Sequence, residues 1–221
     1  MPVPGADTEV EMRKKTFNAQ RPMLNVLRRD AFTLIELLIV ITIIAILLGL
    51  LFPAFRGIQN QAKRTQTKND LTQIVTAVNS FYTEYGKYPL STSSDTTFGP
   101  GGSPATNETL LNALRGLDAT LNPRQIVFIS PPDVKDKSNP RSGIGIDTSN
   151  AGQYFDPWGK NYVTRIDGDY DNQVDNPYSA NAGSAPKLRS GVIAWSLGKD
   201  GTGGSGDKKS ASSDDDVTSW Q

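Results

Sequence analysis

The chain contains no cysteine and no histidine among its 221 residues. Without cysteine there is no disulfide, no thiolate nucleophile and no thiolate metal ligand. Without histidine there is no Ser-His-Asp triad, no histidine general base and no imidazole ligand for a metal. The metal chemistry that remains uses oxygen ligands, which suit calcium and magnesium. These absences remove most routes to catalysis, and we predict that the protein is not an enzyme.

The chain also lacks net charge, because 23 Lys and Arg residues balance 23 Asp and Glu residues. Nucleic-acid-binding proteins usually present a basic surface, so this balance gives no reason to expect DNA or RNA as a partner. The length suffices for one domain with a modest hydrophobic core.

A long apolar run is present, and its only polar side chains between Phe32 and Phe52 are Thr33, Glu36 and Thr42. About 20 apolar residues at a rise of about 1.5 Å span a hydrocarbon core of about 30 Å, so the run predicts a membrane-spanning helix. A secretory signal peptide would be shorter and would carry no glutamate. In a plain single-span anchor, Glu36 would be incidental. A carboxylate in lipid is costly unless it pairs with an opposite charge.

The segment RRDA-FTLIELLIVITIIAILLGLLFPAF resembles the class III signal of type IV pilins and type II secretion pseudopilins. This resemblance implies that a prepilin peptidase cuts between Ala31 and Phe32 and methylates the new amino group of Phe32. It also implies that Glu36 of one subunit pairs with the Phe32 amine of a neighbour and sets the register of a filament. The helix proline of the family falls on Pro53. Ala31 stands where the family usually has glycine.

A second, amphipathic part of the helix is predicted over residues 56–85, because apolar residues recur there at three- and four-residue spacings. Gly86 and Pro89 predict its end, since glycine adopts a left-handed conformation readily and proline cannot continue a helix. The remaining pattern predicts a short helix over 107–116 capped by Asn107 or Thr106, strands over 122–130, 162–166 and 192–196, and loops over 91–106 and 131–153.

The C-terminal segment SLGKDGTGGSGDKKSASSDDDVTSWQ places an acidic run after a glycine-rich turn. Major pseudopilins hold one calcium in the matching loop. The resemblance implies that Asp200, Asp214 and Asp216 offer carboxylates and that Leu197 offers its backbone carbonyl. Calcium takes roughly six to eight oxygen ligands, and glycines let carbonyls turn inward. The alternative is a solvated acidic tail, which is the usual nature of an Asp run.

A second acidic stretch contains Asp167, Asp169, Asp171 and Asp175. The spacing is similar to the start of an EF-hand loop, although Asn172 replaces the required glycine and Tyr178 replaces the closing glutamate. These four residues are candidates for a second calcium site. The alternative is a hairpin turn rich in Asp and Asn.

Together these features predict an α+β fold, in which a long N-terminal helix packs its second half on a small antiparallel β-sheet head. The expected parts are a leader peptide (1–31), a transmembrane and filament-core helix (32–53), an amphipathic helix (54–89) and a periplasmic head with the calcium loop (90–221).

The resemblance implies a structural subunit of a bacterial type II secretion pseudopilus, anchored in the inner membrane by one span with its head in the periplasm. Its expected partners are further copies of itself, prepilin peptidase, the other pseudopilins and the inner-membrane secretion platform. A surface type IV pilus, a DNA-uptake pilus, a minor pseudopilin and a plain membrane-anchored binding module are the alternatives. Pilins often carry a C-terminal disulfide, so the lack of cysteine favours the pseudopilin.

Overall fold

The computed structural model describes residues 32–180, 185–203, 206–207 and 214–220. The chain divides into two compact units, Met1–Gly49 and Leu50–Gln221. Helix α1 covers Leu34–Tyr85 and so contributes residues to both units. The expected leader, with Ala31 at its end, lies outside the described residues.

In the first unit, the apolar side chains of α1 are exposed on all sides of the helix. Leu34 is 82% exposed, Ile41 56% and Leu47 61%. A helix that is apolar all round is normally buried in a protein interior or in a membrane. Among the residues whose side chains the structure describes, which leave out residues 51–56 of α1, no helix combines the length and the apolar character needed to cross a membrane.

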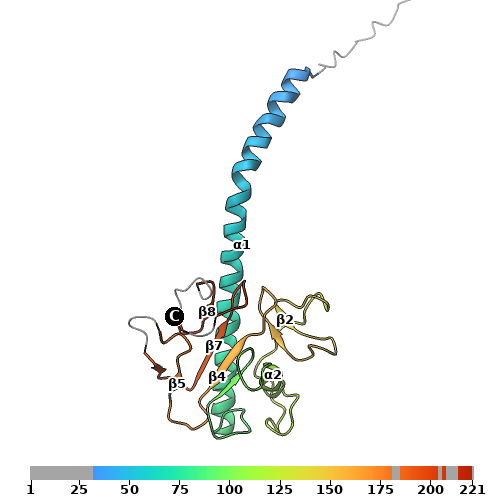
Figure 1. Ribbon diagram of the computed structural model, residues 1–221. Helices are drawn as coiled ribbons and strands as arrows, with labels where there is room; N and C mark the ends of the chain where they lie inside the picture. The colour runs from blue at the N-terminus through green and yellow to red at the C-terminus, as the bar shows by residue number, and fades with distance from the viewer. Residues whose placement is uncertain (1–31, 181–184, 204–205, 208–213, 221) are drawn as a thin grey trace, which may run out of the picture. The chain divides into compact units, whose positions relative to one another are not determined.

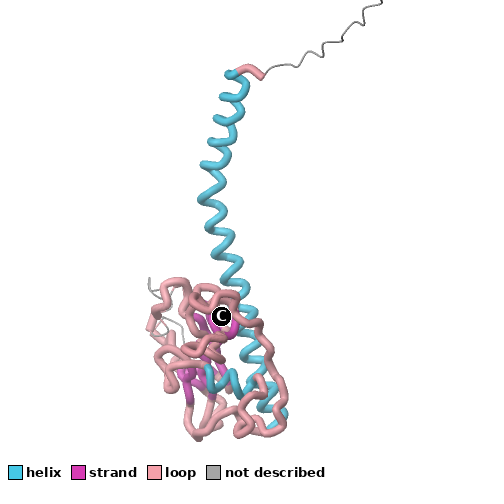
Figure 2. The backbone as a smooth tube through the Cα atoms, turned by 90° about the vertical axis from the view of Figure 1, so that its right-hand side faces the viewer, coloured by secondary structure: helices cyan, strands magenta, loops and turns pink. Residues whose placement is uncertain are grey.

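The second unit is built on a four-stranded antiparallel sheet in the order β1–β4–β7–β8 (Figure 1). These strands are Thr96–Phe98, Val163–Ile166, Val192–Ser196 and Val217–Thr218. Two small antiparallel pairs join β2 (Gly143–Ile144) to β3 (Tyr154–Phe155) and β5 (Val174–Asp175) to β6 (Lys187–Leu188). Helix α2 covers Glu108–Leu114, and Figure 2 shows that loops make up much of the remainder. The predicted α+β class is confirmed.

One face of the sheet packs against the second half of α1. The shared core includes the fully buried Leu71, Ile74 and Val78 of α1 and Ala194 of β7. Phe81 extends this core, with ring centroids 4.6 Å from Tyr85 and 5.3 Å from Phe128. The three- and four-residue spacing of the buried positions confirms the predicted amphipathic helix.

The opposite face of the sheet carries a second hydrophobic cluster. Val163, Ile193 and Trp195 pack there with Val174 and Tyr178. Alternate residues of β7 therefore face different clusters, and the whole strand is buried. A strand covered on both faces is expected to be mostly apolar, as β7 is from Val192 to Trp195.

The predicted strand over 122–130 is wrong. Asn122 is fully buried, accepts a hydrogen bond from the backbone N–H of Ile126 at 3.1 Å and donates to its carbonyl at 2.7 Å. Gln125 adopts φ 51°, which a β-strand does not allow. The buried amide therefore holds this segment in a turn. The segments 91–106 and 131–153, which were predicted to be loops, contain the short strands β1 and β2 respectively.

The side chain of Asn107 joins three segments of the head. Its side-chain amide donates to the carbonyls of Tyr154 and Tyr162 at 3.0 and 2.9 Å, and its oxygen accepts from the N–H of Tyr154 at 2.9 Å. Asn107 occupies the N-cap position of α2, as predicted, and its backbone carbonyl accepts from the N–H of Leu111 at 3.0 Å. Its side chain makes no capping bond, because the amide is used by β3 and by Tyr162 before β4.

Candidate functional site

The start of α1 holds the carboxylate of Glu36 within a single chain. Glu36 Oε2 accepts hydrogen bonds from the backbone N–H of Thr33 at 2.8 Å and from its hydroxyl at 2.7 Å. The N–H of Glu36 lies 3.3 Å from the Thr33 hydroxyl, to which it donates. This reciprocal arrangement is a capping box, in which the side chains of the first and fourth residues satisfy each other's backbone N–H groups.

The capping box could have been found from the sequence, since Thr-x-x-Glu before an apolar run is its signature. Phe32, the residue whose amine is expected to pair with Glu36, is 80% exposed beside it. The described structure therefore gives Glu36 an intramolecular partner in Thr33, and the pairing of Glu36 with the amine of another subunit stays a prediction.

The glycine-rich turn after β7 is closed by Asp215. Oδ2 of Asp215 accepts from the N–H groups of Lys199 at 2.5 Å and Asp200 at 3.1 Å. Gly198 has φ +63°, and a Cβ there would lie 2.6 Å from the carbonyl oxygen of Asp215. Glycine is therefore required at this close approach. The backbone carbonyl of Leu197 accepts from Gly201 at 3.1 Å.

The expected calcium carboxylates lie in different environments. Asp200 is exposed and Asp214 has an exposed side chain, whereas Asp216 is 3% exposed. The hydroxyl of Tyr178 donates to Asp216 at 2.6 Å, and Arg64 donates to the backbone carbonyl of Asp214 at 2.6 Å. In the described residues, these carboxylates do not form a group of three within 4.8 Å of one another.

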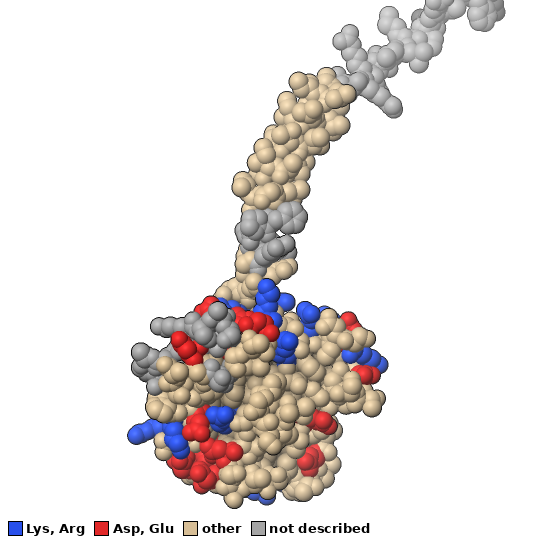
Figure 3. Space-filling view, viewed as in Figure 1, with Lys and Arg blue, Asp and Glu red and all other residues tan. Residues whose placement is uncertain are grey.

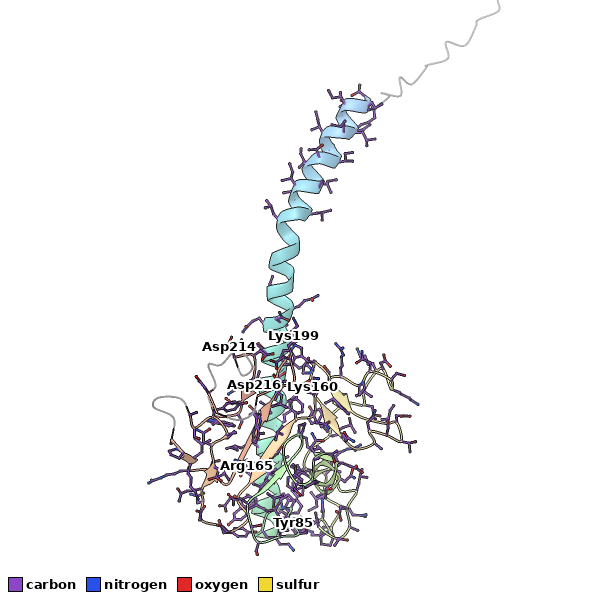
Figure 4. The ribbon with its side chains drawn as sticks, in the orientation of Figure 1. Tyr85, Lys160, Arg165, Lys199, Asp214 and Asp216 are labelled. Atoms are coloured by element: carbon purple, nitrogen blue, oxygen red, sulfur yellow. The ribbon has the colours of Figure 1, made fainter. Side chains whose placement is uncertain are left out.

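Asp215, the central residue of the acidic run, was not among the ligands predicted from the sequence. Asp215, rather than Asp214 or Asp216, lies against the glycine-rich turn. Its second carboxylate oxygen, Oδ1, is buried and accepts no hydrogen bond in the described structure. Figure 4 shows Lys199, Asp214 and Asp216 at one end of the head. A buried carboxylate oxygen without a donor is a position suited to a cation.

The second acidic stretch brings together only part of the predicted set. Asp167 and Asp169 lie with Asp95, with ligand oxygens all within 4.8 Å of one another. Asp171 instead pairs with Lys187 at 3.5 Å, and Asp175 lies in β5. Asp95 was not predictable as a ligand, because a Ser- and Thr-rich loop carries no ligand spacing of its own.

The electrostatics of this acidic group favour a bound positive charge. Burial raises the pKa of Asp95, and the neighbouring charges of Asp169, Asp167 and Asp171 raise it further. Asp167 is 2% exposed and accepts from the N–H groups of Tyr170 and Asn172, both at 2.7 Å. Acidic side chains are visible at the lower left of Figure 3. A divalent cation would relieve the repulsion, although exposed acidic groups are common without one.

The family model of the prokaryotic N-terminal methylation motif matches residues 27–52, which include Phe32, Thr33 and Glu36. The chain is type IV pilin-like. The type IV major pilin protein PilA of Myxococcus xanthus is 41% identical over 61 residues. This match covers 28% of the pilin-like chain and 28% of that protein. No solved structure matches the chain significantly.

Proposed function

We propose that the pilin-like chain is a structural subunit of a filament, processed before Phe32 and held in the membrane by the apolar part of α1 until it assembles. The observation that carries this proposal is the methylation motif over residues 27–52, which overlaps the start of α1, where the apolar side chains described up to Leu50 are exposed on all sides. The exposed apolar side chains of such a helix must be buried, and in a filament the same helices of neighbouring subunits would bury them.

The proposed register contact is made by Glu36. In the single chain its carboxylate is satisfied by Thr33, so it does not stand unpaired in an apolar environment. Cleavage before Phe32 would create a cationic amine. In the filament, that amine on one subunit would pair with Glu36 of the next, and one axial stagger would satisfy the charges.

We further propose that the filament is a type II secretion pseudopilus, with a single inner-membrane span and the head in the periplasm. Prepilin peptidase, other pseudopilins and the secretion platform are its proposed partners. The lack of cysteine and the glycine-rich, acidic C-terminal ending support this class. The likeness to a type IV major pilin supports the broader filament class and keeps a surface pilus as the second candidate.

Deletion of the gene in its native host separates these two candidates. For a pseudopilus, we expect secreted proteins to accumulate in the periplasm, and the wild-type gene to restore their export. The measurement is quantitative mass spectrometry of the medium and the periplasm. An unchanged set of secreted proteins, together with loss of filaments from the sheared cell surface, would instead establish the surface pilus.

We propose calcium as the stabilising ion of the head. The residues that would hold it at the C-terminal turn are Asp215, Asp200, Asp216 and the carbonyl of Leu197, with Asp214 as an exposed further carboxylate. Support comes from the buried Oδ1 of Asp215, which accepts no hydrogen bond in the described structure. In a chain without cysteine, the ion would link the turn to the end of the chain. The group of Asp95, Asp167 and Asp169 is the second candidate.

Calcium at about 100 times its Kd is expected to stabilise the head by about 2.7 kcal/mol and to raise its Tm by several degrees. Asp215→Ala should remove this calcium-dependent increase, whereas Asp169→Ala should leave it in place. The measurement is thermal unfolding of the purified chain in EDTA and in calcium. If Asp169→Ala alone removes the increase, the ion belongs to the other acidic group; if calcium leaves the wild-type Tm unchanged, neither site is a calcium site.

A further inference from the structure

A buried carboxylate lies where α1 first enters the core of the head. Asp70 of α1 is only 8% exposed, and Oδ2 accepts from the hydroxyl of Tyr162 at 2.7 Å. The hydroxyl of Tyr154 lies close enough to this carboxylate to lower its pKa. The rings of Tyr154 and Tyr162 meet edge-on with centroids 4.8 Å apart. The hydroxyls of Tyr154 and Tyr162 therefore both approach the Asp70 carboxylate of α1.

No positive charge compensates this acid in the part of the chain that the structure describes. Asp70 takes no part in the ion pairs between Arg124 and Glu84 and between Lys187 and Asp171. Lys68, two residues before Asp70 on α1, donates to the carbonyl of Thr218.

The titratable groups that face Asp70 are Tyr154 of β3 and Tyr162 before β4, and Asp156 lies close enough to act on Tyr162. All of them are neutral or negative near neutral pH. Burial therefore raises the pKa of Asp70, and the hydrogen bonds of the two tyrosines only oppose that shift. A buried anion without a counter-charge costs stability, so the neutral carboxyl is favoured.

Asp70 lies at the edge of the contact between α1 and the sheet, so the free-energy cost of its buried charge weakens that edge. Thr67, one turn earlier, is fully buried, and its hydroxyl oxygen makes no hydrogen bond in the described structure. Leu71, Ile74 and Val78, which follow, are buried and apolar. The N-terminal edge of the contact between helix and sheet is thus polar and poorly satisfied, whereas the rest is apolar.

We propose that Asp70 is a proton-operated latch, which closes the N-terminal edge of the contact between α1 and the sheet when its carboxyl is neutral and loosens it when the carboxyl is anionic. The neutral carboxyl accepts from one tyrosine hydroxyl and donates its own proton to the oxygen of the other. The anion keeps both acceptor contacts but must be held away from water. This change affects the contact between α1 and the sheet within one chain, so the proposal does not depend on filament formation.

The direction of the pH effect follows from linkage. The folded chain holds the proton of Asp70 at higher pH than the unfolded chain does. Its stabilising effect is complete below the usual range for an Asp carboxyl, at about pH 4, and is lost as the pH rises through the folded-state pKa. Neutralising Asp70 permanently should therefore tighten the contact at neutral pH and should change little in acid.

The test is hydrogen–deuterium exchange of the full chain in detergent, followed in peptides that cover residues 64–72, at about pH 4 and about pH 7.5. Variant and wild type are compared at the same pH, so the pH dependence of the chemical exchange rate cancels. We expect Asp70→Asn to exchange several-fold more slowly than wild type at the higher pH and nearly equally at the lower. Asn69→Ala, at the exposed neighbouring position, is the matched control and should follow wild type.

Tyr162→Phe provides an independent variant, because it removes a donor that the anion needs more than the neutral acid does. It should speed exchange more at the higher pH than at the lower. The latch is overturned if Asp70→Asn exchanges as fast as wild type, or faster, at the higher pH. It is also overturned if the effect of Tyr162→Phe is the same at both pH values.

Discussion

Glu36→Ala is expected to abolish filament assembly while leaving the chain associated with the membrane. The substitution removes the only acidic side chain between Phe32 and Phe52, so the apolar run is preserved. It also removes the proposed partner of the cationic amine at Phe32, and that amine would then lie unpaired among apolar helices. Shearing followed by immunoblotting measures the filaments, and membrane fractionation measures retention of the subunit.

Glu36→Gln separates the capping contacts that the structure shows from the charge pairing that we propose. Glutamine serves in a capping box as glutamate does, so the contacts with Thr33 can persist without the charge. If charge pairing sets the register, the Gln variant loses filaments as the Ala variant does. Normal filaments from Glu36→Gln would show that capping is sufficient, and normal filaments from Glu36→Ala would refute the register contact altogether.

Asn107→Ala is expected to lower the free energy of unfolding of the head by about 3 kcal/mol. Asn107 is fully buried, and its amide makes three hydrogen bonds to the backbone of Tyr154 and Tyr162. Truncation leaves the N–H of Tyr154 and the carbonyl of Tyr162 without these partners in a site closed to water. Each such loss costs about 1–3 kcal/mol. Urea denaturation of the purified chain measures the change.

A surface asparagine provides the comparison for this prediction. Asn69→Ala changes an exposed residue of α1, and we expect its effect to stay within about 0.5 kcal/mol. An Asn107→Ala variant as stable as Asn69→Ala would mean that the junction between α2, β3 and β4 does not depend on this amide.

Elements with a strong local pattern were predictable from the sequence. The buried positions of α1 repeat every three or four residues over several turns, and Gly86 ends the helix with φ +67°, as expected of a residue after a helix C-terminus. Residues 192–196 form β7 as predicted, because a strand buried on both faces is mostly apolar, here from Val192 to Trp195.

Elements that depend on distant partners were not predictable. β1 and β8 are short edge strands that pair with β4 and β7, and their own residues carry little periodicity. The segment 122–130 has the composition of a strand, yet the buried amide of Asn122 makes it a turn. A side chain that satisfies backbone groups locally competes with a sheet, and composition does not reveal which prevails.

The candidate sites also divide into one that is contiguous in the sequence and others that folding assembles from distant residues. The methylation motif is contiguous, so the sequence contained it in full. The acidic groups are assembled by folding: Asp95 joins Asp167 and Asp169 from another loop, and Asp215 is selected from three consecutive aspartates by its contact with the turn at Gly198. Sequence spacing predicted acidic, oxygen-rich sites, but only the fold shows which carboxylates face each other.

We propose above that this pilin-like chain is cut before Phe32 and assembled into a filament. The intact mass of the protein from membranes of its native host tests both the cut and the methylation. We expect a chain that begins at Phe32 and carries one added methyl group. A chain that still carries residues 1–31, in cells whose prepilin peptidase is active, would leave Glu36 without an amine partner and would contradict the filament assignment.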